Sequence, residues 1–215
     1  MLVRDRMTSP AKTVTATTPF QDALNLMREG KFRRIPVVDE HGSLVGIVSE
    51  RDMLHAAPSP ATSLSIWEVN YLLWRLKASD VMTENVVSVA PETPIEVAAY
   101  LMVSKKIGGL PVVDQQNRVI GVITETDIFK AFTELFAGDE HGVRIEVRVP
   151  EASGTLARLT QAIFDLGGDI RSMGTFYDTT TDHRVLMVKV AGVDQGKLTA
   201  RVAELGDEIL DARTV

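Results

Sequence analysis

The chain has 215 residues, a length that suits two domains, and its hydrophobic content of 45% is normal for a protein with a packed core. It contains no cysteine, which excludes disulfides, thiolate metal sites and cysteine nucleophiles, and its net charge of −6 removes the usual driving force for binding long nucleic acids. No apolar run approaches the ~20 residues that span a bilayer, and the first residues lack the apolar core of a signal peptide, so we expect a cytoplasmic protein that binds neither nucleic acid nor membrane.

A gap-free repeat with an offset of 75 positions organises the first part of the chain. Residues 35–39 (IPVVD) align with 110–114 (LPVVD), and residues 46–52 (GIVSERD) align with 121–127 (GVITETD). Agreement at this density and at one constant offset does not arise by chance. Two equivalent units therefore follow each other along the sequence.

Each copy of the repeat predicts a helix, two strands and a second helix. In the first copy, residues 19–27 place apolar side chains on one helical face behind a proline at the helix start. The short apolar runs 35–38 and 44–48 predict neighbouring strands joined by a turn. Ser49 and its counterpart Thr124 follow the second strand and begin the second helix. Such a unit leaves one sheet face uncovered, so we expect the two copies to cover each other.

Residues 61–78 separate the copies and are rich in large apolar side chains, including Trp67 and Trp74. We interpret this stretch as a connecting helix that packs both tryptophans on the pair of copies or in a dimer interface. A helix on a lipid surface is the weaker alternative, because only Arg75 and Lys77 would attract anionic headgroups.

A different pattern begins after a polar, glycine-bounded linker at 136–142. Residues 143–149 alternate apolar and charged side chains, which is typical of a half-buried strand. The later elements are two helices and three strands, predicted at 156–166, 169–177, 184–190, 198–205 and 208–212. The order β-α-β-β-α-β over residues 143–215 is the split βαβ arrangement of a ferredoxin-like sandwich.

The repeat resembles the CBS family. The characteristic sequence motif of this family is a glycine, two apolar residues, Ser or Thr, two variable residues and Asp. Both copies contain this motif. The resemblance implies an α/β fold in which CBS motif 1 (1–60) and CBS motif 2 (79–135) form a pseudo-twofold tandem pair. Residues 143–215 resemble an ACT domain, an α+β fold, through their element order and the Pro-to-Gly-x-Leu turn after the first strand. The CBS–CBS–ACT order is similar to that of the AcuB-like proteins associated with acetoin utilisation.

The CBS resemblance implies an adenine nucleotide (AMP, ADP or ATP) as a regulatory ligand. In CBS pairs the Asp of this motif, here Asp52 and Asp127, accepts hydrogen bonds from both ribose hydroxyls. The Ser or Thr of the motif, here Ser49 and Thr124, contacts ribose or phosphate, and the helix N-terminus adds N–H donors for phosphate. The same residues also suit a helix N-cap that needs no ligand, and the two roles are compatible.

Adenine needs an apolar slot with a few backbone partners. The matching positions in the two copies are apolar, and they are Val14, Ile35, Pro36, Val89, Leu110 and Pro111. The copies differ just before this slot, where the first has Arg34 and the second has Gly109. Arg34 either pairs with a phosphate or obstructs the slot, whereas Gly109 leaves room and brings no charge. We therefore expect two sites of unequal affinity.

In the ACT-like part, Ser153, Gly154 and Leu156 form a turn that often meets a small ligand at a dimer interface. Asp169 and Ile170 stand where many ligand-binding ACT domains have Asn and Ile, and an Asp there would pair with an amino group. The resemblance thus implies an amino acid as the ligand class and a homodimer as the assembly. The alternative is a dimerisation domain that binds no ligand.

Motifs of catalysis are missing from the sequence. There is no G-x-S-x-G, P-loop or G-x-G-x-x-G, and none of the four histidines has a second ligand at metal spacing. We therefore expect no catalytic residues and no metal. The leading hypothesis is a regulatory, nucleotide-sensing module that acts on a partner protein. The alternatives are a ligand-free adaptor that regulates a partner enzyme and a small accessory enzyme.

Overall fold

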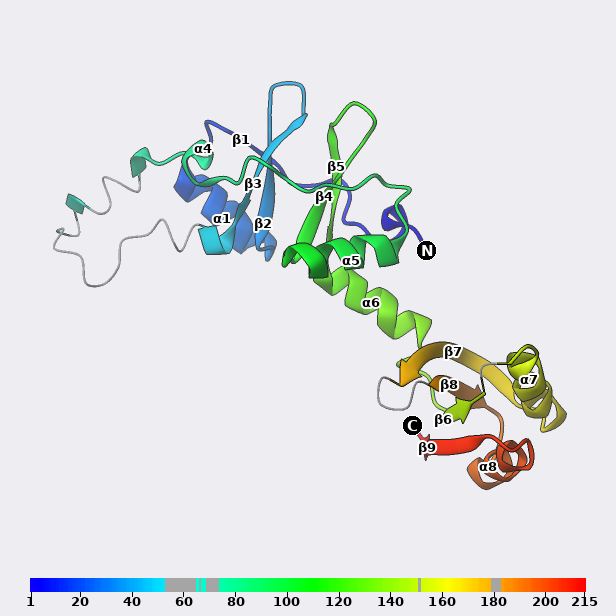
Figure 1. Cartoon of the computed structure of the whole chain (residues 1–215). Helices are drawn as coiled ribbons and strands as arrows, with labels where there is room; N and C mark the ends of the chain where they lie inside the picture. Colours follow the sequence, from blue (N-terminus) through cyan, green and yellow to red (C-terminus); the bar gives the residue numbers. More distant parts are fainter. Residues whose placement is uncertain (53–64, 66, 69–73, 151, 179–182) are drawn as a thin grey trace. The chain divides into compact units, whose positions relative to one another are not determined.

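The computed structural model describes the whole chain except residues 53–64, 66, 69–73, 151 and 179–182 (Figure 1). The chain divides into two compact units, Met1–Ile128 and Phe129–Val215. Within the described part, none of the helices combines the length and the apolar character that crossing a membrane requires.

The first unit contains both copies of the repeat, and each copy has a small sheet packed against a helix. In the first copy, β1 (Val14–Thr15) pairs in parallel with β2 (Arg34–Val38), and β2 pairs antiparallel with β3 (Leu44–Ser49). The helix α1 (Phe20–Gly30) buries its predicted apolar face in the same core as the side chains of these strands. The spacing of its apolar residues thus correctly predicted which face of the helix is covered.

The second copy repeats this arrangement with α5 (Ile95–Lys105), β4 (Gly109–Val113) and β5 (Val119–Thr124). Its two strands keep the register of β2 and β3, and the strand irregularity falls at the equivalent position. Three further helices flank these elements, namely η1 (Val3–Asp5), α4 (Ala78–Val81) and α6 (Glu125–Leu135). The predicted order of helix, two strands and second helix is confirmed for this copy.

The segments that precede the two copies are exchanged in space. Thr8 precedes the first copy in the chain, but it pairs with Val122 in β5 of the second copy through backbone hydrogen bonds of 2.9 and 3.0 Å. Thr83 precedes the second copy and pairs in the same way with Ile47 in β3 of the first copy, at 2.9 and 3.0 Å. Each leading segment therefore lies against the sheet of the other copy.

The insert between the copies lies mostly outside the described residues, so the connecting helix expected at 61–78 stays a prediction. Its two tryptophans are described. Trp67 is 85% exposed and Trp74 is 78% exposed. The expectation that both pack on the pair of copies is therefore wrong for this chain by itself, whereas packing in a dimer interface remains a prediction.

The second unit is an antiparallel sheet of four strands with the order β7-β8-β6-β9. Two helices pack on one face of this sheet, where side chains from both helices and from the strands form one core. The elements are β6 (Val143–Val149), α7 (Thr155–Asp165), β7 (Asp169–Asp178), β8 (His183–Ala191), α8 (Gln195–Glu204) and β9 (Glu208–Thr214). The predicted β-α-β-β-α-β order is confirmed, and it is consistent with a ferredoxin-like domain.

Residues 136–142 connect α6 to β6, and this predicted linker begins with two docked residues. The ring of Phe136 lies on Gly174 in β7, so closely that a Cβ on the glycine would come within 2.6 Å of the ring. The carbonyl oxygen of Ala137 accepts a 2.7 Å hydrogen bond from Nζ of the buried Lys189. A buried ammonium group needs such an acceptor, so this end of the linker is held against the sheet.

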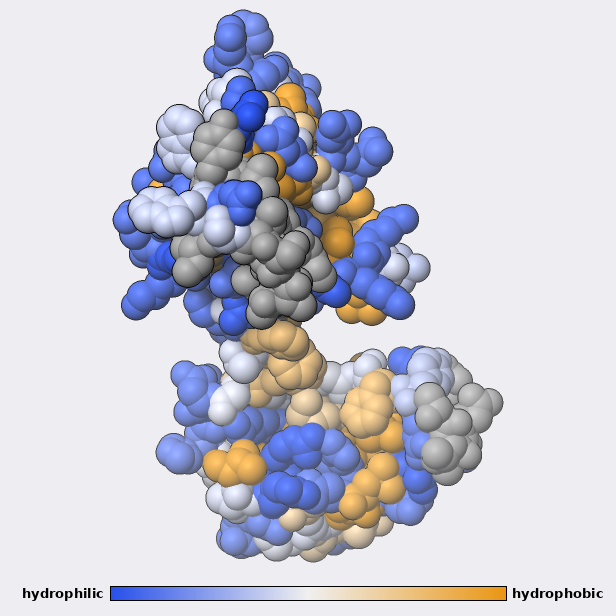
Figure 2. Space-filling model, turned by 90° about the vertical axis from the view of Figure 1, so that its left-hand side faces the viewer, coloured by the Kyte–Doolittle hydropathy of each residue, from blue (hydrophilic) through white to orange (hydrophobic). Residues whose placement is uncertain are grey.

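The equivalent helices α1 and α5 present different outer faces. Hydrophobic side chains reach the surface in separate patches among hydrophilic ones on the face drawn in Figure 2. On α5 the exposed apolar residues are Val97, Tyr100 and Val103. The three equivalent positions of α1 are polar and exposed, and they are Asp22, Asn25 and Arg28. The repeat thus keeps the core of the two copies alike and lets their surfaces differ.

Candidate functional site

Two clefts lie at equivalent positions of the repeat in the first unit. The first cleft has a volume of about 480 Å³ and contains Ser49 and Asp52. The second cleft has a volume of about 650 Å³ and contains Thr124 and Asp127. Both volumes fall within the range of small-molecule sites. The structure therefore places the Ser or Thr and the Asp of each CBS motif in a cleft large enough for a small molecule.

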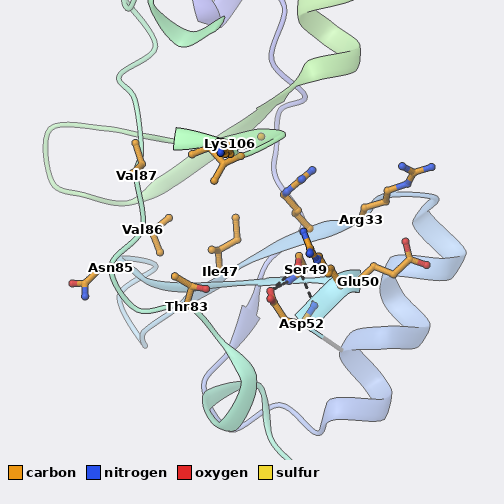
Figure 3. A pocket seen from close by; sticks show the side chains of 14 residues that line it. Arg33, Ile47, Ser49, Glu50, Asp52, Thr83, Asn85, Val86, Val87 and Lys106 are labelled. Carbon is orange, nitrogen blue, oxygen red and sulfur yellow. Dashed lines mark hydrogen bonds between the residues drawn. The ribbon is translucent and has the colours of Figure 1, made fainter. Parts of the chain in front are cut away.

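Each cleft is built from both copies. In the first cleft, the turn 49–52 of the first copy lies across from Lys106 of the second copy, and residues 83–87 form a side wall (Figure 3). The second cleft combines the equivalent segments, with the turn 124–127 together with residues 30–34 of the first copy. The exchange of leading segments supplies the side wall in both cases. A ligand in either cleft would therefore touch both copies at once.

The carboxylate of Asp52 is held by the start of its own helix. Its Oδ2 accepts hydrogen bonds from the backbone N–H of Ser49 at 2.8 Å and from Oγ of Ser49 at 2.6 Å (Figure 3). Oδ2 of Asp127 accepts the same two bonds from Thr124, at 2.9 and 2.7 Å. The backbone N–H of Asp52 also donates to Oγ of Ser49 at 3.2 Å, so the predicted cap by the hydroxyl is present in the first copy, and in both copies the bonds to Oδ2 fix the position of the carboxylate.

The cap leaves one oxygen of each carboxylate able to accept further hydrogen bonds. Among the described residues, nothing donates a hydrogen bond to Oδ1 of Asp52 or of Asp127. A carboxylate oxygen can accept two hydrogen bonds, so Oδ1 alone is able to hold both hydroxyls of a diol.

Basic side chains gather in both clefts, although the chain as a whole carries a net charge of −6. Among the described residues, four basic and two acidic residues line each cleft. Arg33 and Arg34 line both clefts. The other basic residues belong to one cleft each, and they are Arg51 and Lys106 in the first and Lys12 and Lys31 in the second. The clefts therefore suit an anion, helped by the N–H groups at the helix start.

Arg34 lies between the two clefts. Its Nη1 donates a 3.0 Å hydrogen bond to the carbonyl oxygen of Gly108 in the second copy. Gly109, its counterpart by the repeat, lines the first cleft, and a Cβ there would come within 3.5 Å of Cδ of Arg34. Of the two roles expected for Arg34, pairing with a phosphate is open to it in either cleft. It is part of a wall and does not fill either hollow.

The positions expected to form the adenine slot do not line the clefts. Ile35 and Leu110 are completely buried, and Val14 and Val89 are nearly so. Pro36 and Pro111 are buried in the strands beside them. This corrects the expected slot, because all six side chains are buried and leave no surface for a ring.

Other apolar residues form the walls, and the sequence analysis missed them. In the first cleft they are Ile47, Val86, Val87 and Ile107, and in the second they are Pro10, Ala11, Phe32 and Val122. The sequence repeat shows that these positions are apolar in both copies, because Ile47 corresponds to Val122 and Ile107 to Phe32. It does not show that they line a cleft, because that depends on which segments of the two copies pack together.

The second unit has a cleft of its own, of about 530 Å³, at the start of α7. Ser153, Gly154 and Leu156 line it together with Arg184, and Gly154 has a φ of 87° that favours glycine. Asp169 is not part of this cleft. It pairs with Ala191 at the other end of β8, about 20 Å along the strand from Arg184.

The expected ligand set of the ACT-like part is therefore split within one chain. Ile170 lies beside Asp169 and packs against the core of the unit. Asp169 is exposed and forms an ion pair with Arg171 at 3.3 Å. Among the described residues of the whole chain, no cluster of three or more His, Asp or Glu side chains could hold a metal ion.

The sequence model of the CBS domain matches residues 3–59 and 78–134. The chain belongs to the CBS domain family. It is 34% identical over 128 residues to a CBS domain-containing protein of Dictyostelium discoideum, which covers 60% of this chain and 88% of that protein. It is also 29% identical over 131 residues to L-aspartate semialdehyde sulfurtransferase of Methanocaldococcus jannaschii, but there the match covers only 23% of the enzyme. The CBS pair is thus also a part of larger enzymes.

Solved CBS structures have the fold of the first unit. A candidate acetoin utilization protein (AcuB) from Vibrio cholerae matches with a TM-score of 0.54 and 33% identity, over 65% of this chain and 95% of that one. CBSX2 in complex with AMP matches with a TM-score of 0.53 and 31% identity, over 61% and 95%. A CBS domain pair in complex with 5′-methylthioadenosine and S-adenosyl-L-methionine matches with a TM-score of 0.53 and 28% identity, over 65% and 98%. The ligands in the last two structures share an adenosine group.

Proposed function

We propose that the chain is a regulatory module that binds an adenine nucleotide in its clefts and has no catalytic activity of its own. The observation that carries this proposal is the open Oδ1 atom of Asp52, repeated at Asp127, beside a surplus of basic side chains. Ribose hydroxyls need an acceptor in a fixed position, and phosphate needs cations and helix N–H groups. The apolar walls offer the adenine ring a surface.

The charge of the clefts favours one class among the adenosine compounds. AMP, 5′-methylthioadenosine and S-adenosyl-L-methionine carry the same adenosine group, so a carboxylate that binds ribose would accept all three. AMP, ADP and ATP are anions, whereas the sulfonium of S-adenosyl-L-methionine is a cation. Four basic against two acidic lining residues in each cleft favour the anions.

Regulation would follow from the two-copy construction of the clefts. A ligand shifts a protein between two arrangements only if it binds one of them more tightly, and a ligand that touches both copies can do so. Asp127 lies in the first turn of α6, and the later residues of that helix belong to the second unit. We propose that the second unit transmits the nucleotide signal to a partner protein, such as an enzyme of acetoin utilisation.

Stability measurements on the full chain with AMP, ADP, ATP and S-adenosyl-L-methionine test this proposal. At a concentration of 100 times its Kd, a bound nucleotide should add about 2.7 kcal/mol to the free energy of unfolding. The double variant Asp52→Ala/Asp127→Ala should lose this gain, while the exposed control Asp165→Ala should keep it. Stabilisation by none of the nucleotides would overturn the proposal in favour of a ligand-free adaptor. Conversion of a nucleotide by the pure chain would favour an accessory enzyme.

For the second unit we propose an ACT-like role in dimerisation or in binding a small carboxylate such as an amino acid. The observation in favour is the cleft at the start of α7, where Arg184 and the helix N-terminus suit a carboxylate. Binding of single amino acids to wild type and to Gly154→Val distinguishes the two roles. A valine at a φ of 87° is strained and would close this turn, so it should abolish binding by an effector domain. Wild type that binds no amino acid would leave dimerisation as its role.

A further inference from the structure

Arg34, like Arg33, is shared between the two clefts, whereas the other basic residues belong to one cleft each. It lines both clefts, and its guanidinium donates to the carbonyl oxygen of Gly108 at 3.0 Å. The same carbonyl accepts a hydrogen bond from the backbone N–H of Glu125 at 3.3 Å, in the first turn of the helix that carries Asp127. The side chain of Arg34 is therefore linked to the ligand-binding turn of the second cleft.

The repeat does not duplicate this link. The counterparts of Arg33 and Arg34 in the second copy are Gly108 and Gly109. A Cβ on Gly108 would lie 2.7 Å from Nη2 of Arg34 and 2.6 Å from Oε2 of Glu125. The absence of a side chain at this position is what lets the guanidinium reach the second copy. Arg34 therefore bonds across to the second copy, and no equivalent arginine returns from the second copy.

A single guanidinium cannot pair fully with phosphates in two clefts at once. Its hydrogen bond to Gly108 holds it at a residue that lines the second cleft but not the first. A phosphate in the second cleft would meet Arg34 already in position. A phosphate in the first cleft would have to draw it away from that bond. The charge available to one cleft thus depends on whether the other is occupied.

We infer that Arg34 couples the two clefts, so that an anionic nucleotide in the second cleft weakens binding in the first. This inference rests on the proposed function and specifies its regulation. The second cleft fills first. The coupling requires a phosphate, because adenosine alone carries no negative charge to form an ion pair with the guanidinium. Coupling between two sites commonly changes affinity by about 5- to 150-fold, and we expect about tenfold here.

Calorimetric titration of the full chain with AMP, and separately with adenosine, tests the coupling. Wild type should bind two AMP molecules, the second about tenfold more weakly than Asp127→Ala binds its single AMP in the first cleft. Arg34→Met keeps the apolar stem and removes the charge, and it should weaken both events and abolish the difference. Lys31→Ala removes a cation of the second cleft alone and should leave the coupling in place. Adenosine should bind both clefts independently.

The outcomes separate the coupling from the proposed function. Failure of wild type to bind AMP would overturn both. Binding of two AMP molecules with the coupling unchanged in Arg34→Met would overturn the coupling alone. If Arg34→Met loses stability, Arg34→Gly, which copies the residue of the second repeat, provides the same comparison. One AMP bound by wild type and two by either variant would support the coupling in a stronger form, whereas one AMP bound by all of them would overturn it.

Discussion

The hydroxyl group of Ser49 donates a 2.6 Å hydrogen bond to Oδ2 of Asp52, and so fixes the carboxylate that faces the first cleft. This bond belongs to a helix cap, and the same carboxylate has its Oδ1 open toward a ligand. In the proposed function, this side chain stabilises the helix start through one oxygen and binds ribose through the other. The two contributions are separable by mutation.

Ser49→Ala should remove the cap bond and keep the carboxylate. We expect it to lower the free energy of unfolding by about 1 kcal/mol, the usual effect of losing an N-cap side chain. Its AMP affinity should stay close to that of wild type, whereas Asp52→Ala should strongly weaken binding in the first cleft. Urea denaturation and calorimetry measure the two effects. Equal losses of affinity in both variants would mean that Asp52 acts only through the helix start.

The two clefts should respond unequally to loss of their carboxylates. They differ in volume, and Arg51 of the first cleft has the uncharged counterpart Thr126 in the second. Asp127→Ala should reduce the first, tighter binding event, and Asp52→Ala the weaker one. Titration of each variant with AMP gives the factor by which its affinity falls below that of wild type. Reduction by the same factor would contradict the predicted inequality.

The apolar outer face of α5 should form a homodimer contact. A second copy of α5 packed antiparallel about Tyr100 would bring Glu96 at one end of the helix opposite Lys105 at the other, so the charges are complementary. Tyr100→Glu should weaken dimerisation at least about 30-fold, as for a central aromatic contact. Asn25→Glu on α1 is the matched control, because it is the equivalent position of the repeat.

Sedimentation over a range of concentrations distinguishes these variants. Wild type and Asn25→Glu should be dimers at concentrations where Tyr100→Glu is monomeric. The same mass for all three would exclude this face as the contact. It would leave the exposed tryptophans of the insert as the remaining prediction from the sequence.

The ion pair between Arg158 and Asp207 should stabilise the second unit more than an exposed pair does. The carboxylate of Asp207 is 1% exposed and accepts a 2.8 Å bond from Nη2 of Arg158, whose side chain is 43% exposed. Arg158→Ala leaves a buried carboxylate without its cation, which should cost about 2–3 kcal/mol, less than for a fully buried pair. Arg201→Ala, at an exposed pair with Asp165, should cost under about 1 kcal/mol. If chemical denaturation shows that both variants lose the same free energy of unfolding, the Arg158–Asp207 pair is not the stronger one.

Two turn carboxylates should make the first unit sensitive to acid. Hydrogen bonds from the backbone N–H of Ser43 and then of His41 lower the pKa of Asp39 below its ordinary value of 3.8. The backbone N–H of Arg118, and then its side chain, lower the pKa of Asp114 in the same way. Because these pKa values are lower in the folded state, their stabilisation is present above about pH 4 and is lost as the pH falls through the folded values.

The variant Asp39→Asn/Asp114→Asn should therefore lose less Tm than wild type when the pH is lowered from about 5 to about 2. Thermal unfolding followed at several pH values measures this difference. Asp22→Asn, on the exposed face of α1, is the control. A steeper loss in the double variant than in wild type would contradict the sign of the effect.

The sequence by itself determined the features that depend on neighbours along the chain. The offset of 75 positions gave the two copies, the spacing of apolar residues gave the buried face of α1, and Ser49 three residues before Asp52 gave the helix cap. The alternation in β6 and the order of elements after it gave the antiparallel sheet. Helical and strand periodicity and capping are local, so one sequence suffices to read them.

Only the tertiary structure decided which residues meet across the clefts. Backbone pairing of Thr8 with Val122 and of Thr83 with Ile47 joins segments that are far apart in the chain, and no local pattern records such pairing. The tertiary fold also places Lys106 in the same cleft as Asp52 and buries Ile35 in the core of the first copy. The fold also brings Arg34 to Gly108. The sequence shows that residue 108 has no side chain, but only the tertiary structure shows that Arg34 occupies the space a side chain would fill.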